Sequence, residues 1–307
     1  MLASKSERLD ELLVVAAGKG GILTFADLRE LKVTRAEREA HLAARRWELL
    51  PNRGVIVHTG PVVGNDAWWK ALAEVGVTAR LGGITSLMAD GLTGYDEPLV
   101  HVWVTQGTHK GRPEGVRVHE TRRWASSDAV DVGIPRAKPA VATVQAALWA
   151  KTARQAALAL VMPIQQRLAR ATDVAEELRR VKRHKFRRPL LAAIQDIVDG
   201  AHSLNELDFA RECRERGLPE PSRQVVRRTS QGRVYLDVYW EAYRVALEVN
   251  GAGHGRLDRV LADEIRSIDI QLRRDAAVQI SVLTLRLEPD HFFAKLAELL
   301  RANGWLG

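Results

Sequence analysis

The sequence predicts a multidomain protein of mixed α+β or α/β class. Residues 1–60 show three helical patterns followed by a short hairpin, which is the layout of a winged helix-turn-helix. Residues 61–200 combine short strands with alanine-rich helices, and this pattern predicts an α+β middle region with a helical connector. Residues 201–307 follow the order αββαβα, which predicts a sheet flanked by helices. A chain of 307 residues is long enough for such a division.

The composition is that of a globular, basic protein. Hydrophobic residues make up 46% of the chain and charged residues 27%, and the formal net charge is +8 at pH 7. This excess favours a polyanionic partner, in the first place DNA. The N-terminal residues lack a signal-peptide pattern, and no apolar run reaches the ~18 residues of a membrane span. Cys213 is the only cysteine, which excludes an intramolecular disulfide and a cysteine-based zinc site. We therefore expect a cytoplasmic protein with no membrane partner.

The N-terminal region begins with three helices. Leucine and alanine at helical spacing predict a helix over residues 9–18, and a short second helix, capped by Thr24, is predicted to extend through residue 31. Thr34 and Glu37 have the spacing of a capping box, in which each side chain satisfies a free backbone N–H group of the other residue. This pair opens a third helix, predicted over residues 35–46.

A hairpin follows the third helix, with strands predicted over residues 47–50 and 55–58. In a winged helix-turn-helix the third helix enters the major groove of DNA, and basic side chains contact phosphates. The same basic residues could equally form the solvated face of a protein-interaction module. The candidate DNA-binding residues are Arg35, Arg38, Arg45 and Arg46 of the third helix and Arg53 of the wing.

Five segments of this region carry a family pattern: Val15–Ala17, Gly21–Thr24, Leu28, Arg45–Trp47 and Arg53–Val57. With them, the first sixty residues resemble the N-terminal domain of AbiEi-type (type IV) antitoxins. The matching motifs are mostly structural, so the resemblance implies a DNA-binding module without specifying the DNA sequence that it binds. This interpretation implies DNA as a partner. It also implies either a toxin partner or a second copy of the chain in a homo-oligomer.

The middle region is predicted to contain helices over residues 66–75 and 85–89 and strands over 100–105 and 116–119. Its three histidines do not have the spacing of a local metal-binding motif, and cross-strand polar positions explain two of them. No metal site is therefore predicted here. The histidines are His101, His109 and His119.

A helical connector is predicted from Pro139 to about Asp199, with breaks at Pro163 and Pro189. Residues 179–188 of this connector are the densest basic run of the chain. Such a run could follow a phosphate backbone and release counterions as it binds. It could also be a solvated helix end that nearby glutamates partly neutralise.

The C-terminal region is predicted to open with a helix capped by Ser203, with Glu206 at the third helical position. Two strands, residues 234–239 and 245–249, are joined by a turn at 241–244. The remaining predicted elements are a helix over 258–274, a strand over 280–287 and a helix over 290–302.

Each of the two strands carries one carboxylate among apolar or aromatic residues, namely Asp237 and Glu248. A buried carboxylate must be paired or must ligate a metal. Carboxylates on adjacent strands can converge on one point, and a divalent cation is the natural reason to bring them together. The sequence therefore predicts a metal pair, or the remnant of one.

The order of these features resembles the PD-(D/E)xK nuclease fold, and more closely the subgroup of very-short-patch repair endonucleases. The residues that carry the resemblance are Ser203 with Glu206, Gly217–Pro219, Asp237–Val238, Glu248–Gly251, His254, and Asp263 with Arg266. It implies a restriction-endonuclease-like domain over about the last hundred residues. In that family Asp237 and Glu248 would hold Mg²⁺ or Mn²⁺ for phosphodiester hydrolysis.

The same resemblance implies roles for three further residues. Glu206 would reach the site directly or through water, although a capping role explains it equally well. His254, in the glycine-rich loop 251–255, would donate a proton to the leaving oxygen or contact the scissile phosphate, unless it is only an exposed loop histidine. Asn250 stands where this subgroup has aspartate and the wider superfamily has lysine. It keeps a carbonyl oxygen as a weak ligand but lacks either charge, and this puts turnover in doubt.

Two hypotheses follow from these observations. The first is a metal-dependent DNA endonuclease whose winged helix delivers DNA to the C-terminal site. The second is a non-catalytic DNA-binding regulator of antitoxin type, in which a degenerate nuclease fold serves as a scaffold. Asn250 favours the second, and the joint presence of Glu206, Asp237, Glu248 and His254 favours the first. We favour the first.

Overall fold

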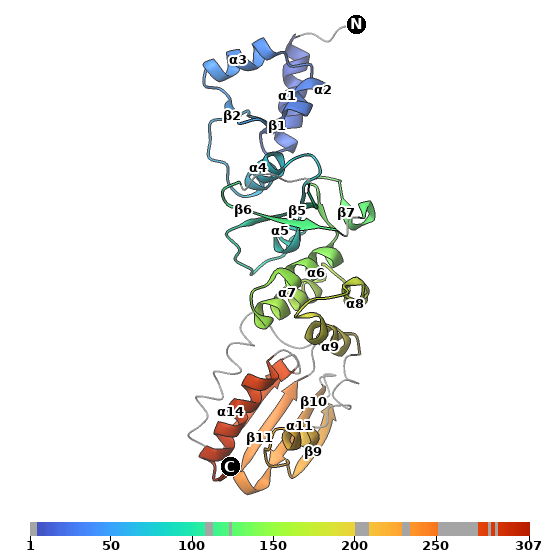
Figure 1. The fold of residues 1–307 in the computed structure, drawn as a ribbon. Coiled ribbons are helices and arrows are strands. Elements are labelled where there is room, and N and C mark those ends of the chain that lie inside the picture. The colour runs from blue at the N-terminus through green and yellow to red at the C-terminus, as the bar shows by residue number, and fades with distance from the viewer. Residues whose placement is uncertain are drawn as a thin grey trace. The chain divides into compact units, whose positions relative to one another are not determined.

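The structure, a computed structural model, describes residues 5–107, 113–122, 125–199, 209–228, 234–250, 276–281, 284–285 and 288–307. Over these ranges the chain is a mixed α+β protein with three small sheets (Figure 1). It forms two compact units, Met1–Ala142 and Thr143–Gly307. None of the helices within the described ranges is long and apolar enough to span a bilayer.

The first part of unit 1 contains the three predicted helices and the predicted hairpin, together with a strand that was not predicted. The additional strand β1 pairs with β3, so the small antiparallel sheet has the order β1-β3-β2. The predicted cap at Thr24 and the predicted capping box of Thr34 with Glu37 are both present. The elements are α1 (Lys5–Gly18), β1 (Ile22–Thr24), α2 (Phe25–Glu30), α3 (Arg35–Ala43), β2 (Glu48–Leu50) and β3 (Gly54–Ile56).

The pairing of β3 with β1 requires a glycine at position 54. Gly54 lies opposite Thr24, and a Cβ atom at Gly54 would lie 2.0 Å from the carbonyl oxygen of Leu23. No real contact is that short, so any larger residue would push the two strands apart. Leu23 and Val55 beside this contact are completely buried, and they belong to the core that joins α1, α2 and the sheet.

The third helix is shorter than predicted, and this corrects the placement of two candidate arginines. Helix α3 ends at Ala43, and Arg45 has a left-handed backbone with φ of 53°. The N–H of Arg46 donates to the carbonyl of His41 and that of Arg45 to Leu42, both at 3.0 Å, which is a Schellman ending. Arg45 and Arg46 therefore lie in the turn after α3.

The second part of unit 1 is a five-stranded mixed sheet with two helices. The sheet order is β6-β5-β4-β8-β7, and β5 and β6 run parallel. The predicted helices and long strands of this region are confirmed. The elements are α4 (Asn65–Val75), β4 (Arg80–Leu81), α5 (Gly83–Ala89), β5 (Val100–Thr105), β6 (Val116–Thr121), the 3-10 turn η1 (Ser126–Asp128), β7 (Ala129–Val130) and β8 (Arg136–Ala137).

The helical connector consists of separate helices, and its prolines do not mark the breaks. Pro163 lies inside its helix, which continues to Gln165, and Pro189 lies in the first turn of the next helix but one. A first-turn N–H has no partner within the helix, so a proline costs little there. The predicted breaks at these two residues are therefore wrong. The helices are α6 (Pro139–Trp149), α7 (Ala153–Gln165), α8 (Ala171–Arg180) and α9 (Arg187–Asp199).

The C-terminal part of unit 2 is a four-stranded sheet of order β12-β11-β10-β9 (Figure 1). The strands β9, β10 and β11 are antiparallel neighbours, whereas β12 runs parallel to β11. The predicted strand pair, its turn and the final helix are confirmed. The elements are α11 (Phe209–Glu215), β9 (Arg223–Arg228), β10 (Val234–Trp240), the 3-10 turn η2 (Glu241–Tyr243), β11 (Val245–Asn250), β12 (Ala276–Ser281) and α14 (Pro289–Ala302).

Two strand predictions in this sheet need correction. Strand β9 was not predicted, and β12 begins four residues before the predicted strand at 280. Thr284 and Leu285, which were predicted to lie in that strand, are buried outside it. The predicted helix over 258–274 and the helix opening at Ser203 lie outside the described residues.

An aromatic cluster covers one face of this sheet. Phe209 of α11 packs edge-on against Trp240 of β10, with ring centroids 6.1 Å apart, and it also contacts Phe292 and Phe293 of α14. The indole N–H of Trp240 donates to the carbonyl of Pro219 at 2.8 Å. Helices α11 and α14 are thereby held on the same face of the sheet.

The glycine-leucine-proline turn at 217–219 has a structural explanation. Gly217 has φ of 68° and ends α11, where the N–H of Leu218 donates to the carbonyl of Cys213 at 2.9 Å. Pro219 then presents its carbonyl to Trp240. The turn thus anchors α11 to the end of β10.

We predict that Gly54→Ala destabilises unit 1 by about 1–3 kcal/mol, because the added methyl group must displace β1 or β3. Gly18→Ala is the matched control. Gly18 is the last residue of α1, and apart from its chain neighbours and its own helix backbone no atom lies within 4 Å of the position that its Cβ would take, so alanine there should be neutral or slightly stabilising. Denaturant unfolding, with hydrogen exchange of peptides from residues 5–57, measures both. Equal stability of the two variants would contradict the contact at Gly54.

Candidate functional site

The candidate site is the pair of carboxylates on β10 and β11. The antiparallel register places Asp237 directly opposite Glu248. Residues directly opposite each other project from the same face of a sheet, with Cβ atoms about 4.5–5.5 Å apart. The prediction that these two carboxylates lie close together is therefore supported by the strand pairing.

The alternation of side chains along both strands separates this pair from the aromatic core. Asp237 lies between the buried Leu236 and Val238, and Glu248 lies between the buried Leu247 and Val249. Asp237 and Glu248 themselves are half-buried. They occupy the face of the sheet that is opposite the face covered by α11 and α14.

Electrostatics makes this arrangement unusual. Like charges directly opposite each other on neighbouring strands destabilise a sheet. A cation between the two carboxylates reverses the sign of this interaction, and carboxylate oxygens are the ligands that hard divalent cations prefer. The donor set of Asp237 and Glu248 therefore fits Mg²⁺ or Mn²⁺.

A third polar residue continues this row across the sheet. The parallel register of β11 and β12 places Gln279 beside Glu248, and Gln279 is exposed between the buried Val278 and Ile280. Its amide can supply a neutral oxygen ligand or a hydrogen bond to a phosphate. The sequence interpretation missed Gln279 because the strand was predicted to begin at residue 280. The buried-polar-buried alternation over 278–280 was the signal that could have revealed it.

The other predicted catalytic residues are described only in part. The backbone of Asn250 pairs with Tyr235 and Ser281 at the end of β11, two residues after Glu248. Glu206 and His254 lie outside the described residues, as do Asp263 and Arg266. Across the ranges that are described, no group of three or more His, Cys, Asp or Glu side chains is arranged to hold a metal ion.

The predicted DNA-binding arginines lie in three environments. Arg35 is exposed on α3 and pairs with Glu39 at 2.6 Å. The guanidinium of Arg38 lies 5.0 Å from the ring centre of Phe25, so this side chain packs partly against α2. The other three are exposed outside any helix: Arg45 and Arg46 in the turn after α3, and Arg53 in the turn between β2 and β3.

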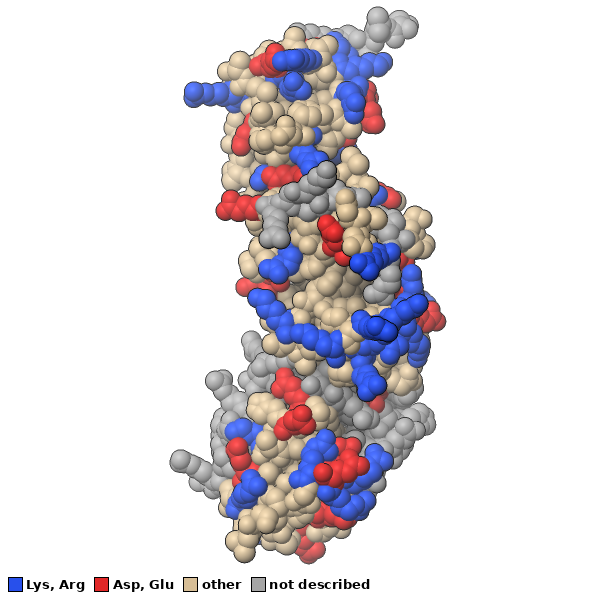
Figure 2. Space-filling model, in the orientation of Figure 1, with Lys and Arg blue, Asp and Glu red and all other residues tan. Residues whose placement is uncertain are grey.

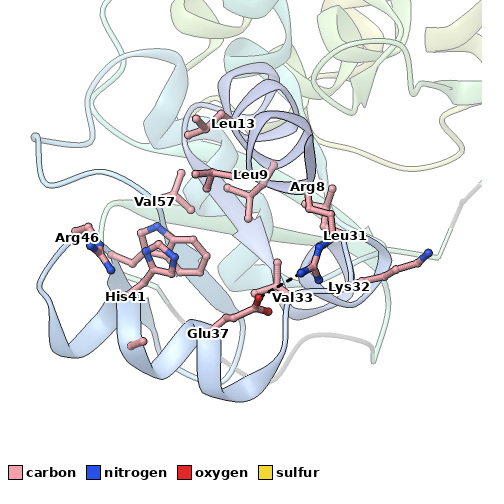
Figure 3. A pocket seen from close by; sticks show the side chains of 13 residues that line it. Arg8, Leu9, Leu13, Leu31, Lys32, Val33, Glu37, His41, Arg46 and Val57 are labelled. Atoms are coloured by element: carbon pink, nitrogen blue, oxygen red, sulfur yellow. Dashed lines mark ion pairs between the residues drawn. The ribbon is translucent and has the colours of Figure 1, made fainter. Parts of the chain in front are cut away.

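Helix α3 is a surface helix, because none of its residues is fully buried. A groove of about 560 Å³ separates part of it from α1 (Figure 3). Arg8 on α1 reaches across to Glu37 on α3, with 3.7 Å between the charged atoms. At the other end His41 stacks on Trp47, with ring centroids 4.2 Å apart. Two side-chain contacts thus hold α3 in place while its polar residues stay accessible.

Two of the three histidines of the middle region form a pair. His101 on β5 and His119 on β6 lie on neighbouring parallel strands, and a hydrogen bond of 3.1 Å joins Nδ1 of His101 and Nε2 of His119. The carboxylate of Glu97 lies 3.6 Å from Nε2 of His101. His109 lies outside the described residues. The expectation that cross-strand positions explain two histidines is confirmed.

Burial and mutual proximity keep this pair neutral. Burial, with smaller contributions from His101 and Arg117, lowers the pKa of His119 to about 3. Burial also lowers the pKa of His101, an effect that Glu97 partly offsets. Neutral imidazoles can share a hydrogen bond, whereas two imidazolium ions in this position would repel each other. The pair is therefore a polar contact of the folded sheet at neutral pH.

Comparison with known proteins does not assign this chain to a family. A scan against protein-family models gives no match, and a search of curated proteins gives none. Function is therefore inferred from the residues and their geometry.

We predict that unit 1 loses stability as the pH falls below about 6.5. The pKa of His119 is about 3 when folded and 6.5 at its ordinary value, so the unfolded chain binds the proton first in this window. The loss can reach about 1.4 kcal/mol per pH unit. Denaturant unfolding between pH 7.5 and 4.5 measures it.

In this experiment His119→Gln should weaken the pH dependence without removing it, because His101 also titrates below its ordinary pKa. His291→Gln is the control, since that histidine is exposed on α14. An unchanged pH dependence in His119→Gln would show that His119 is not the group that resists protonation.

We predict that Mn²⁺ or Mg²⁺ raises the unfolding temperature of the wild-type protein and that Glu248→Gln removes this effect. Ligands that bind only the folded state stabilise it. With EDTA present, Glu248→Gln should be as stable as wild type or more stable by about 0.2–1 kcal/mol, because one of two opposed charges is gone. Calorimetry measures both quantities.

The matched control is Glu241→Gln, which removes an exposed carboxylate from the turn between the same two strands. It should keep the full metal response. The same metal-induced rise in Glu248→Gln as in wild type would exclude Glu248 as a ligand.

Proposed function

We propose that this protein binds DNA and hydrolyses its phosphodiester bonds with a divalent cation held by Asp237 and Glu248. The observation that carries this proposal is the register of β10 and β11, which places the two carboxylates opposite each other on one face. Two like charges at this position repel each other, and a divalent cation between them would offset this repulsion.

In this proposal each residue of the site has a separate role. Asp237 and Glu248 hold the cation, and Gln279 adds a neutral polar group beside Glu248. When bound, Mg²⁺ or Mn²⁺ supplies a Lewis acid for a phosphodiester oxygen and lowers the pKa of a water molecule. From the resemblance, His254 would donate a proton to the leaving oxygen or contact the scissile phosphate, and Glu206 would act at the site directly or through water.

The arrangement of the C-terminal sheet supports a nuclease-like domain. A helix precedes three antiparallel strands, and the fourth strand runs parallel to the third. Both carboxylates come from the two central strands, as the resemblance to the PD-(D/E)xK fold implies. We therefore include the PD-(D/E)xK fold of the C-terminal domain in the proposal.

The N-terminal region supports the DNA-binding part of the proposal. Its order of α1, β1, α2, α3 and a hairpin is that of a winged helix, in which the third helix enters the major groove. Arg35 on α3, the exposed arginines of the following turn and Arg53 of the hairpin turn would then contact DNA. Because Arg45 and Arg46 lie beyond the helix end, we assign them to phosphates instead of bases.

A second candidate function is that of a non-catalytic regulator of antitoxin type. Asn250 favours it, because a neutral amide holds a divalent cation less well than the aspartate of the related subgroup. In this function the protein binds DNA through the winged helix, and the C-terminal domain serves to bind a toxin partner or a second copy of the chain. Cytoplasmic location is part of both proposals.

We predict that the purified protein nicks supercoiled DNA with Mg²⁺ or Mn²⁺ and not with EDTA. Asp237→Ala and Glu248→Ala should each lower the rate by about 10²-fold or more, since even outer-shell partners of metal ligands contribute 10–100-fold. Asn250→Asp should raise the rate, because it adds the charge that the related subgroup has. Gel electrophoresis of the plasmid measures the nicking rate of wild type and of the three variants.

Glu241→Ala is the control for surface charge and should nick at the wild-type rate. The absence of nicking in wild type and in Asn250→Asp would favour the regulator, as would nicking that survives both alanine substitutions. A higher nicking rate in Asn250→Asp than in wild type would indicate a weakened catalytic site, and an unchanged absence of nicking would indicate a site with no catalytic role.

A further inference from the structure

The positive charge of the chain is concentrated in one short segment. Residues 167–188 contain nine lysines and arginines and three acidic residues, so they carry a net charge of +6 out of the +8 of the whole chain. All of these cations except Arg187 are exposed. Figure 2 shows a group of basic side chains over the helical part of unit 2.

The structure gathers the densest part of this charge at the corner between α8 and α9. The two helices pack against each other, and residues 179–188, which we call the basic corner, include the end of α8, the connection and the start of α9. Val181 and Leu190 are buried and anchor the corner from within. The side-chain Nε–H of Arg187 donates to the carbonyl of Val181 and closes the connection. The exposed cations are therefore presented on a fixed turn.

The basic corner contains seven lysines and arginines, and four of them, including Arg187 and Lys185, make contacts within unit 2. Arg180 pairs with Glu177, and Arg179 donates to Gln195 at 3.2 Å. Within the part of the chain that the structure describes, Lys182, Arg183 and Arg188 have no carboxylate partner. Three exposed charges close in sequence thus repel one another in the isolated protein.

The helix dipole of α9 adds to this electrostatic repulsion. The first turn of α9 contains Arg187 and Arg188 and no acidic residue, although the N-terminus of a helix favours negative charge. A polyanion lying along the corner would reverse both unfavourable interactions. The local charge therefore points to a partner with closely spaced negative groups.

We infer that the basic corner is a second nucleic-acid contact, which binds the phosphate backbone of DNA without reading its sequence. This inference rests on the DNA binding of the proposed function and is independent of cleavage. Phosphates follow each other closely along a strand, and arginine binds them with paired N–H groups. A lipid surface fits less well, because binding to it also needs exposed apolar side chains, and residues 179–188 have none among the large exposed hydrophobic residues.

Fluorescence anisotropy of the full-length protein with a labelled 30-base-pair duplex of arbitrary sequence tests this inference. The variant Lys182→Gln/Arg183→Gln/Arg188→Gln removes three exposed charges. We expect its affinity to fall about tenfold or more, and the slope of log K against log salt to become less steep by about two to three, since each phosphate contact contributes about 0.9.

The matched control is Arg211→Gln/Arg214→Gln/Arg301→Gln, which removes the same charge from exposed positions on α11 and α14. Its affinity and salt slope should stay close to those of wild type. Equal losses in both triple variants would reduce the effect to net charge and overturn the inference, as would wild-type affinity and slope in the corner variant.

Further experiments distinguish failure of this inference from failure of the proposed function. Arg45→Gln/Arg46→Gln tests the winged helix, and nicking tests the carboxylate pair, so either can fail while the corner variant still loses affinity. Vesicles with phosphatidylserine test a lipid surface. Loss of vesicle binding in the corner variant together with unchanged DNA binding would overturn the nucleic-acid assignment.

Discussion

The pairing register of β10 and β11 is the constraint on which the C-terminal domain depends. Side chains alternate between the two faces of a strand, so a slip by one residue would move Asp237 into the aromatic core and Leu236 out of it. The apolar face is held by Trp240, which packs against Phe209 and donates to the carbonyl of Pro219. Packing on one face therefore fixes the position of the two carboxylates on the other.

The proposed function gives one account of both the acidic pair and the basic segments of this protein. The carboxylate pair by itself would repel a phosphodiester, and a bound cation converts the same pair into an attractive site. The basic corner and the arginines after α3 carry exposed positive charges outside the pair, and these charges would attract a polyanion. Under the proposed function, the arginines and lysines would contact nucleic acid and the acidic pair would hold a metal. In that function, the neutral amide of Asn250 would hold the metal less well than an aspartate would.

The sequence predicted elements well where their pattern was long, and poorly where it was short or hidden. Both helix caps at Thr24 and Thr34 were recognised, because threonine and a carboxylate at the third helical position act locally. The three-residue strand β1 was missed, because it is too short for alternation to show and exists through its pairing with β3. Strand β9 was missed since arginines stand at both ends of Arg223–Arg228, and β12 was placed late, which concealed Gln279.

The sequence by itself determined the two carboxylate-bearing strands, the turn between them and the surplus of positive charge. These features follow from local propensity and composition, which do not depend on distant residues. Tertiary structure alone decided that Asp237 faces Glu248, that Gln279 extends this row, and that Arg45 and Arg46 leave the helix for a turn before Trp47. Registers and helix ends of this kind are set by which apolar side chains find room in a shared core, and a linear pattern does not contain that information.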